Sequence, residues 1–165
     1  MSKKAIERKI GDFLKIPLSD GSYGYARVLQ NPLIAVYDVK SKNSLCLNEI
    51  AKKKVLFKVC VMNHAIKKGI WPIIGHRPLD AELEKIVKFY KVDKISNEIT
   101  IYWEKGNDYF EEPANFKECK NLEVAAVWEP EHIVERIEDH YAGRKNQFVE
   151  NSKNELKQAG ENGAG

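Results

Sequence analysis

In residues 12 to 30, DFLKIPLSDGSYGYARVLQ, two short runs of strand-forming residues flank a four-residue turn. Apolar side chains at positions 14, 16 and 18 alternate with Lys15 and Pro17, which is the period of a half-buried strand. The segment Ser19–Ser22 contains Gly21, which tolerates positive φ, so the chain can reverse direction there. The stretch therefore predicts an antiparallel hairpin.

The two faces of the returning strand differ in side-chain size. Small residues at positions 24, 26 and 28 share one face and would let a neighbouring sheet or helix approach closely, as small barrels require. Tyr23, Tyr25 and Arg27 share the other face. These three residues either contribute to a binding surface for nucleic acid or cover the edge of the core.

The rest of the chain extends the β pattern and closes with a helix. Further strands are expected at 33–39, 55–61, 85–92, 98–104 and 122–128, with a helical turn near 48–54. Pro130 suits the first turn of a helix that Gly143 ends. We expect a mainly β (α+β) fold: a small antiparallel sheet or partly open barrel, short helical inserts and a closing C-terminal helix. Residues 1–143 are predicted as a single domain, and the polar segment 144–165 as a flexible tail.

Composition narrows the cellular context. The chain has 165 residues, 43% hydrophobic and 31% charged, which is typical of one globular domain. It contains no apolar run near the roughly 20 residues that span a bilayer, and its charged N-terminus is unlike a secretory signal. These features predict a cytoplasmic protein without a membrane partner. Its three cysteines lack a C-x-x-C pair, and Cys60 is expected to be a buried thiol.

The net charge of +3 conceals an uneven distribution. Between positions 38 and 68 there are eight basic residues against two acids, whereas between 104 and 139 there are eleven acids against four bases. A chain that mainly held phosphates would seldom carry such an acidic last third. This distribution favours a protein partner over nucleic acid.

Reactive groups do not converge in the sequence. Loops and motifs that cradle phosphate, bind zinc or expose a nucleophilic serine are absent. His76 and Arg77 stand in the loop WPIIGHRPL, where both could point outward, but no nucleophile or carboxylate partner is visible beside them. We therefore expect no enzyme, no cofactor and no metal site. An enzyme with His76 and Arg77 at its site is one alternative function.

A partner surface is the functional feature that the residues themselves suggest. Carboxylates interleaved with aromatic side chains offer both electrostatic steering and burial to a basic partner. We predict the contact residues to be Glu104, Asp108, Tyr109, Phe110, Glu111 and Glu112, with Trp71, His76 and Arg77 as further candidates. Packing in the core is the competing interpretation for each tryptophan.

Three segments together resemble the immunity protein 26 family: KIGDFLKIPLSDGSYGYARVL, LFKVCVMNHAIKKGIWPIIGHRPL and LEVAAVWEPEHIVERI. The resemblance spans about residues 9 to 140. The positions that carry it are Gly11, Asp12, Phe13, Pro17, Gly24, Trp71, Gly75, Pro78, Trp128, Pro130 and His132. It implies a mostly β cytoplasmic immunity protein (antitoxin) of a polymorphic toxin system. Such a protein would bind a cognate toxin domain, here expected to be a nuclease, and block it without doing chemistry.

The second alternative is a small SH3-like barrel that binds RNA or DNA. Tyr23, Tyr25 and Arg27 would stack on bases, and the lysines of segment 40–68 would contact phosphates. Such a module would lose affinity steeply as salt rises. An immunity protein would instead depend on its protein partner.

Overall fold

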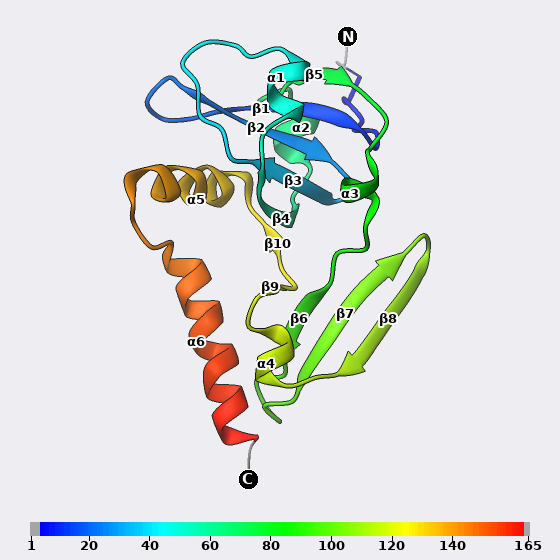
Figure 1. Ribbon diagram of the computed structural model, residues 1–165, viewed down its shortest axis with the longest axis vertical. Helices are drawn as coiled ribbons and strands as arrows, with labels where there is room; N and C mark the ends of the chain where they lie inside the picture. Colours follow the sequence, from blue (N-terminus) through cyan, green and yellow to red (C-terminus); the bar gives the residue numbers. More distant parts are fainter. Residues whose placement is uncertain (1–3, 164–165) are drawn as a thin grey trace. The chain divides into compact units, whose positions relative to one another are not determined.

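The computed structural model describes residues 4–163. The chain divides into two compact units: unit 1 combines Met1–Lys85 with Val127–Tyr141, and unit 2 combines Ile86–Ala126 with Ala142–Gly165. Each unit contains its own β-sheet (Figure 1). Unit 2 thus interrupts unit 1 in the sequence, which differs from the single domain predicted for residues 1–143. Composition and periodicity do not reveal such an insertion, because both units have the same local patterns.

Unit 1 is built on a six-stranded sheet in the order β10-β4-β3-β2-β1-β5. All neighbours are antiparallel except β10, which runs parallel to β4. The strands are β1 Asp12–Pro17, β2 Tyr23–Val28, β3 Leu33–Tyr37, β4 Val55–Val61, β5 Ile73–His76 and β10 Val127–Trp128. The helices are α1 Leu47–Ala51, α2 His64–Lys67, α3 Ala81–Glu84 and α5 Pro130–Ala142.

The predicted hairpin is present as β1 and β2. Its register runs from Phe13 opposite Arg27 to Pro17 opposite Tyr23. Gly21 has φ +82°, the left-handed conformation that a glycine adopts without steric cost. The turn is also fixed by its acid, since the backbone N–H of Ser22 donates to Asp20 Oδ1 at 3.0 Å.

Helix α5 packs on the small-residue face of this hairpin. A Cβ added at Gly24 would lie 3.4 Å from Ile137 Cδ1, at ordinary contact distance, so α5 lies directly over the small residues of β2. Arg136 of α5 lies over the ring of Phe57 at 3.9 Å. Ile133 and Ile137 are buried, which confirms the helix expected from Pro130 onward.

Unit 2 is built on a four-stranded sheet in the order β8-β7-β6-β9, with β9 parallel to β6. The strands are β6 Phe89–Val92, β7 Ile99–Lys105, β8 Asp108–Pro113 and β9 Glu123–Val124. The helices are α4 Phe116–Cys119 and α6 Gln147–Asn162. The turn between β6 and β7 is held by Asp93 Oδ1, which accepts from the N–H groups of Ile95 and Ser96 at 2.8 Å each.

Helix α6 occupies the segment that the sequence predicted as a flexible tail. Asn146 caps it, its side chain accepting from the backbone N–H of Val149 at 3.2 Å. Leu156 and Ala159 are buried in the core of unit 2, which also contains Tyr90, Ile99 and Ile101. The prediction fails because a polar helix of this length depends on a few tertiary contacts that composition does not show.

Replacing Leu156 by alanine should therefore destabilise unit 2. Removing a fully buried leucine leaves a cavity, and we expect a loss of at least about 2 kcal/mol in the free energy of unfolding. Urea denaturation followed by circular dichroism measures it. The matched control is Lys157→Ala, one position along on the exposed side of α6. Equal effects of the two substitutions would mean that α6 does not pack as described.

The expected mainly β (α+β) class and the C-terminal helix are confirmed. Both sheets are mixed, because each contains one parallel pair, and no closed barrel forms within residues 4–163. Among those residues, none of the helices combines the length and the apolar character that crossing a bilayer requires.

Candidate functional site

The predicted contact residues lie in both units. Trp71, His76 and Arg77 belong to unit 1, and the other six lie on the β7–β8 hairpin of unit 2.

Trp71 belongs to the core. Its side chain is 2% exposed, and its backbone N–H donates to the carbonyl of Ala65 at 3.1 Å. A residue this enclosed offers a partner no contact area. The structure therefore corrects the contact role and supports the competing interpretation of core packing.

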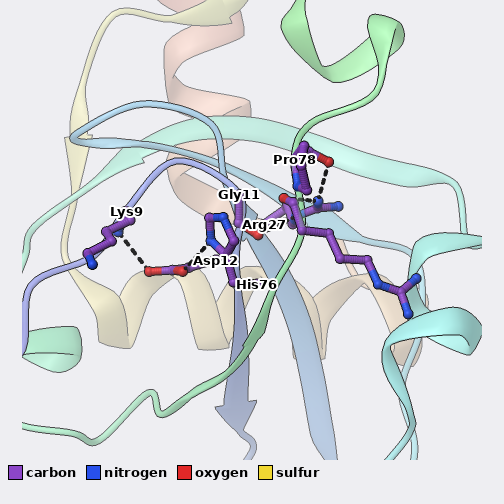
Figure 2. Close-up of polar contacts among 7 residues, drawn as sticks. Lys9, Gly11, Asp12, Arg27, His76 and Pro78 are labelled. Atoms are coloured by element: carbon purple, nitrogen blue, oxygen red, sulfur yellow. Dashed lines mark hydrogen bonds and ion pairs between the residues drawn. The ribbon is translucent and has the colours of Figure 1, made fainter.

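Arg27 is the central polar group of unit 1 (Figure 2). Its guanidinium donates from Nε to the carbonyl of Gly11 at 2.8 Å, and from Nη2 to the carbonyls of Arg77 and Pro78 at 2.6 and 3.0 Å. It lies 3.9 Å over the ring of Phe13, and it is only 3% exposed. One buried cation therefore joins β2 to the segment before β1 and to the loop after β5.

Asp12 ties the same segments together from the other side. His76 Nδ1 lies 2.9 Å from Asp12 Oδ1, and the backbone N–H of Lys9 donates to Oδ2 at 2.7 Å (Figure 2). Asp12 is buried, whereas the side chain of His76 is 52% exposed. The sequence alone does not reveal a carboxylate beside His76, because Asp12 is 64 positions away and becomes its neighbour only through the β1–β5 pairing.

Two glycines near this cluster lie close to neighbouring segments. Gly11 has φ +97°, and a Cβ there would lie 2.2 Å from the carbonyl oxygen of Arg77. At Gly75 a Cβ would lie 2.5 Å from Leu47 Cδ1. Gly11 therefore excludes a side chain, since its φ and the backbone oxygen both oppose one, whereas a side chain at Gly75 would require Leu47 to move.

The burial pattern removes the surface proposed for a nucleic-acid module. Tyr25 is fully buried, and its hydroxyl accepts from the backbone N–H of Leu45 at 3.0 Å. Arg27 is occupied as described above, and only Tyr23 is partly exposed, with Lys15 Nζ 3.8 Å from its ring. Both faces of β2 are covered, which alternation within one strand cannot show.

The acidic stretch from Asp108 to Glu112 is part of a strand. It forms β8, which pairs with β7 from Lys105 opposite Asp108 to Thr100 opposite Pro113. Every β8 residue is exposed. Because successive side chains in a strand point to opposite faces, the predicted contact residues are divided. Glu104, Tyr109 and Glu111 share one face, and Asp108, Phe110 and Glu112 share the other.

The face with Tyr109 carries a network around Lys91 of β6. Lys91 Nζ donates to the Tyr109 hydroxyl at 2.6 Å and to Glu111 Oε2 at 3.3 Å. The Tyr109 hydroxyl and then Thr100 donate to Glu111, and these hydrogen bonds lower the pKa of its carboxyl. Desolvation by itself lowers the pKa of Lys91, but its bonds to Tyr109 and Glu111 outweigh this and raise the pKa. Both groups are therefore charged at neutral pH.

The other face is apolar near its centre and acidic at its rim. The rings of Trp103 and Phe110 stack at 5.4 Å, and Lys88 Nζ lies 4.3 Å from the centre of the Trp103 ring. Phe110 remains 39% exposed. Asp108 and Glu112 flank it on β8, and Lys105 of β7 lies opposite Asp108. Aromatic side chains bordered by charge are typical of protein-binding surfaces.

The acidic last third of the sequence is not one surface. Positions 104–126 belong to unit 2 and hold six acids against three bases, whereas 127–139 belong to unit 1 and hold five acids against Arg136. The interpretation of 104–139 as a single negative region is therefore too broad. Four of the six acids at positions 104–126 lie on the β7–β8 hairpin, beside Lys105.

Unit 1 also contains a group that could hold a divalent cation. His64 Nε2 lies 3.8 Å from Glu129 Oε2 and from Glu131 Oε1, and the three ligand atoms lie within 4.8 Å of one another. Imidazole nitrogen and carboxylate oxygen are common zinc ligands. The two carboxylates also stabilise the N-terminus of α5, which requires no ion. We assign no metal role to the group.

Comparison with known proteins identifies the family of this chain. A sequence model described as immunity protein 26 matches residues 9–100, more than half of the chain. The chain belongs to the immunity protein 26 family. No curated protein and no solved structure matches it. The family match includes the GDF hairpin and the Trp71 to Pro78 segment, and it ends before Trp128, Pro130 and His132.

In this immunity protein 26 family member, the matched residues shape the fold of unit 1. Gly11 and Asp12 belong to the cluster around Arg27, Phe13 stacks under its guanidinium, Gly75 lies against Leu47, and Trp71 fills the core. The β8 strand lies beyond the matched region. The family match therefore describes the fold of unit 1, and it carries no information about the exposed β8 strand.

Lys91, Thr100 and Trp103 complete the hairpin surface and were absent from the predicted set. A two-residue Gly106-Asn107 connection between β7 and β8 was the available signal, because such dipeptides mark tight hairpins. Recognising the hairpin would have placed Trp103 opposite Phe110 and separated Glu111 from Glu112.

Proposed function

We propose that this chain acts in the cytoplasm as an antitoxin. It binds a cognate toxin domain of a bacterial polymorphic toxin system one to one and blocks it, with no bond made or broken. The observation that carries the proposal is membership of the immunity protein 26 family over residues 9–100. An immunity protein implies a toxin partner, and inhibition by binding requires no catalytic group.

The β7–β8 hairpin is the contact surface that we propose. Tyr109 and Phe110 are 55% and 39% exposed, and they point to opposite faces of β8. Exposed aromatic side chains offer the large contact area that binding hot spots use. Asp108, Glu111 and Glu112 surround them with negative charge. His76 and Arg77 remain candidates for a second contact in unit 1, His76 through its exposed side chain.

The toxin is proposed to be a nuclease. Enzymes that cut nucleic acid bind a polyanion, so their substrate clefts are basic. A negatively charged hairpin complements such a cleft and increases the rate of association. The same charges disfavour direct binding of nucleic acid by the chain, and the burial of Tyr25 and Arg27 supports this view.

Co-expression tests the proposal. The polypeptide encoded by the C-terminal part of the reading frame directly upstream should arrest growth when expressed alone, and this chain should restore growth. The purified pair should elute as a one-to-one complex, and equimolar chain should stop cleavage of RNA or DNA by the toxin domain. A toxin domain from an unrelated system serves as the specificity control.

Three outcomes would contradict parts of this proposal. Growth arrest that persists with abundant, folded chain would refute neutralisation. Rescue without a nuclease activity in the purified toxin domain would refute the proposed toxin class alone. Tight binding of an oligonucleotide by the chain, weakened steeply by salt, would favour the nucleic-acid module.

A further inference from the structure

Strand β8 is the longest free edge of the two sheets. In the order β8-β7-β6-β9 its single strand neighbour is β7, and the edge strands of the unit 1 sheet are β10 and β5. β8 has six residues, β5 four, and β9 and β10 two each. An edge strand carries backbone N–H and C=O groups that can pair with another strand. Length and full exposure make β8 the edge best suited to that role.

The ladder determines which backbone groups of β8 point outward. The backbone N–H of Ala114, which directly follows β8, donates to the carbonyl of Ile99 at 3.0 Å. Antiparallel strands alternate between residues that bond their neighbour and residues that face away. Counting back from Ala114, the backbone groups of Tyr109, Glu111 and Pro113 therefore face away from β7. Pro113 agrees with this register, because proline lacks an N–H and is tolerated where that group would point outward.

We propose that the toxin binds by adding one of its own extended segments to β8 as a fifth strand of the unit 2 sheet, and that this segment is rich in lysine and arginine. The inference rests on the function proposed above and specifies its binding mode. The outward N–H groups of Tyr109 and Glu111 bond the added strand, as in other complexes formed by strand addition. The rings of Tyr109 and Phe110 contact it on its two faces.

Charge selects the occupant. β8 holds Asp108, Glu111 and Glu112 and no basic residue, so opposite charges on the added strand form favourable cross-strand pairs. A second copy of this chain would meet the same acids. In an antiparallel pairing centred on Phe110, Asp108 of one copy would face Glu112 of the other, which is repulsive. The charges that keep this edge from pairing with itself thus favour a basic strand from a different protein.

A proline substitution tests the backbone contact. Glu111→Pro removes an outward N–H while leaving the β7 side of the ladder in place, and Glu111→Ala removes the same carboxylate but keeps the N–H. Against the upstream-encoded toxin domain, we expect the proline variant to bind at least about tenfold more weakly than the alanine variant. Equal dissociation constants for two folded variants would overturn the proposal.

Amide hydrogen exchange supplies a second measurement, because side-chain contacts alone would not slow the exchange of the outward N–H groups of β8. In the free protein the N–H groups of Tyr109 and Glu111 should exchange quickly, and those of Phe110 and Glu112 slowly. In the complex all four should exchange slowly. Continued fast exchange at Tyr109 and Glu111 in a formed complex would refute strand addition while leaving toxin binding intact. Self-association of the chain that Glu111→Pro abolishes would identify a second copy as the occupant and also refute the proposal.

Discussion

Replacing Arg27 by alanine is expected to lower the free energy of unfolding by roughly 3 kcal/mol, since one buried and two partly buried hydrogen bonds from a charged donor to backbone carbonyls are lost. Those carbonyls belong to Gly11, Arg77 and Pro78, and their bonds to the guanidinium are 2.6 to 3.0 Å long. The ring of Phe13 would also lose the cation above it. Arg27→Lys should lower the free energy of unfolding by about half as much, because one ammonium group cannot reach all the carbonyl groups that the planar guanidinium bonds.

Chemical denaturation followed by circular dichroism measures this loss. Arg77→Ala is the matched control, since it removes a guanidinium from a residue that Arg27 contacts but keeps the backbone carbonyl that Arg27 bonds. We expect the control to change stability by no more than about 0.5 kcal/mol, as for most surface substitutions. A comparable loss in both variants would show that Arg27 does not act through these carbonyls.

Reversing two charges on β8 should produce the largest change in toxin affinity. Glu111→Lys combined with Glu112→Lys places a positive charge on each face of the strand. Repulsion of a basic partner should weaken binding by about a hundredfold, mostly by slowing association at low salt. The fold should persist, because both side chains are exposed. Titration calorimetry against the toxin domain measures the affinity.

The control must change the net charge equally at another place in unit 2. Glu155→Lys combined with Glu161→Lys does so on the exposed side of α6. Its affinity should stay within about threefold of the original chain, since charges distant from an interface are largely screened. Equal weakening by both pairs would assign the effect to overall charge. No weakening by the β8 pair would exclude that strand from the interface.

Short-range patterns in the sequence predict most of unit 1. The β1–β2 hairpin follows from alternation and a glycine turn, and helix α5 follows from the stripe that buries Ile133 and Ile137. The small face of β2 correctly indicates close packing, which α5 provides at Gly24. These elements are predictable because residues close in sequence determine them.

The missed features depend on residues distant in sequence. β8 is exposed throughout, so it lacks an apolar side that would mark it, and only its pairing with β7 makes it a strand. The segment 122–128 was predicted as one strand, but Glu123–Val124 pairs with β6 and Val127–Trp128 with β4. The role of Arg27 was missed for the same reason, because a lone arginine in a strand usually indicates a solvent-exposed position. Its three acceptors come together only in the folded sheet.

The interruption of unit 1 by unit 2 sets the order in which a growing chain can complete its parts. Strand β10 and helix α5 complete unit 1, and they emerge from the ribosome only after residues 86–126. Until then the face of β2 at Gly24 lacks the helix that covers it. A prematurely terminated product would therefore expose apolar surface and be removed by proteases. Synthesis of this protein thus completes unit 1 only after the β7–β8 hairpin has already been translated.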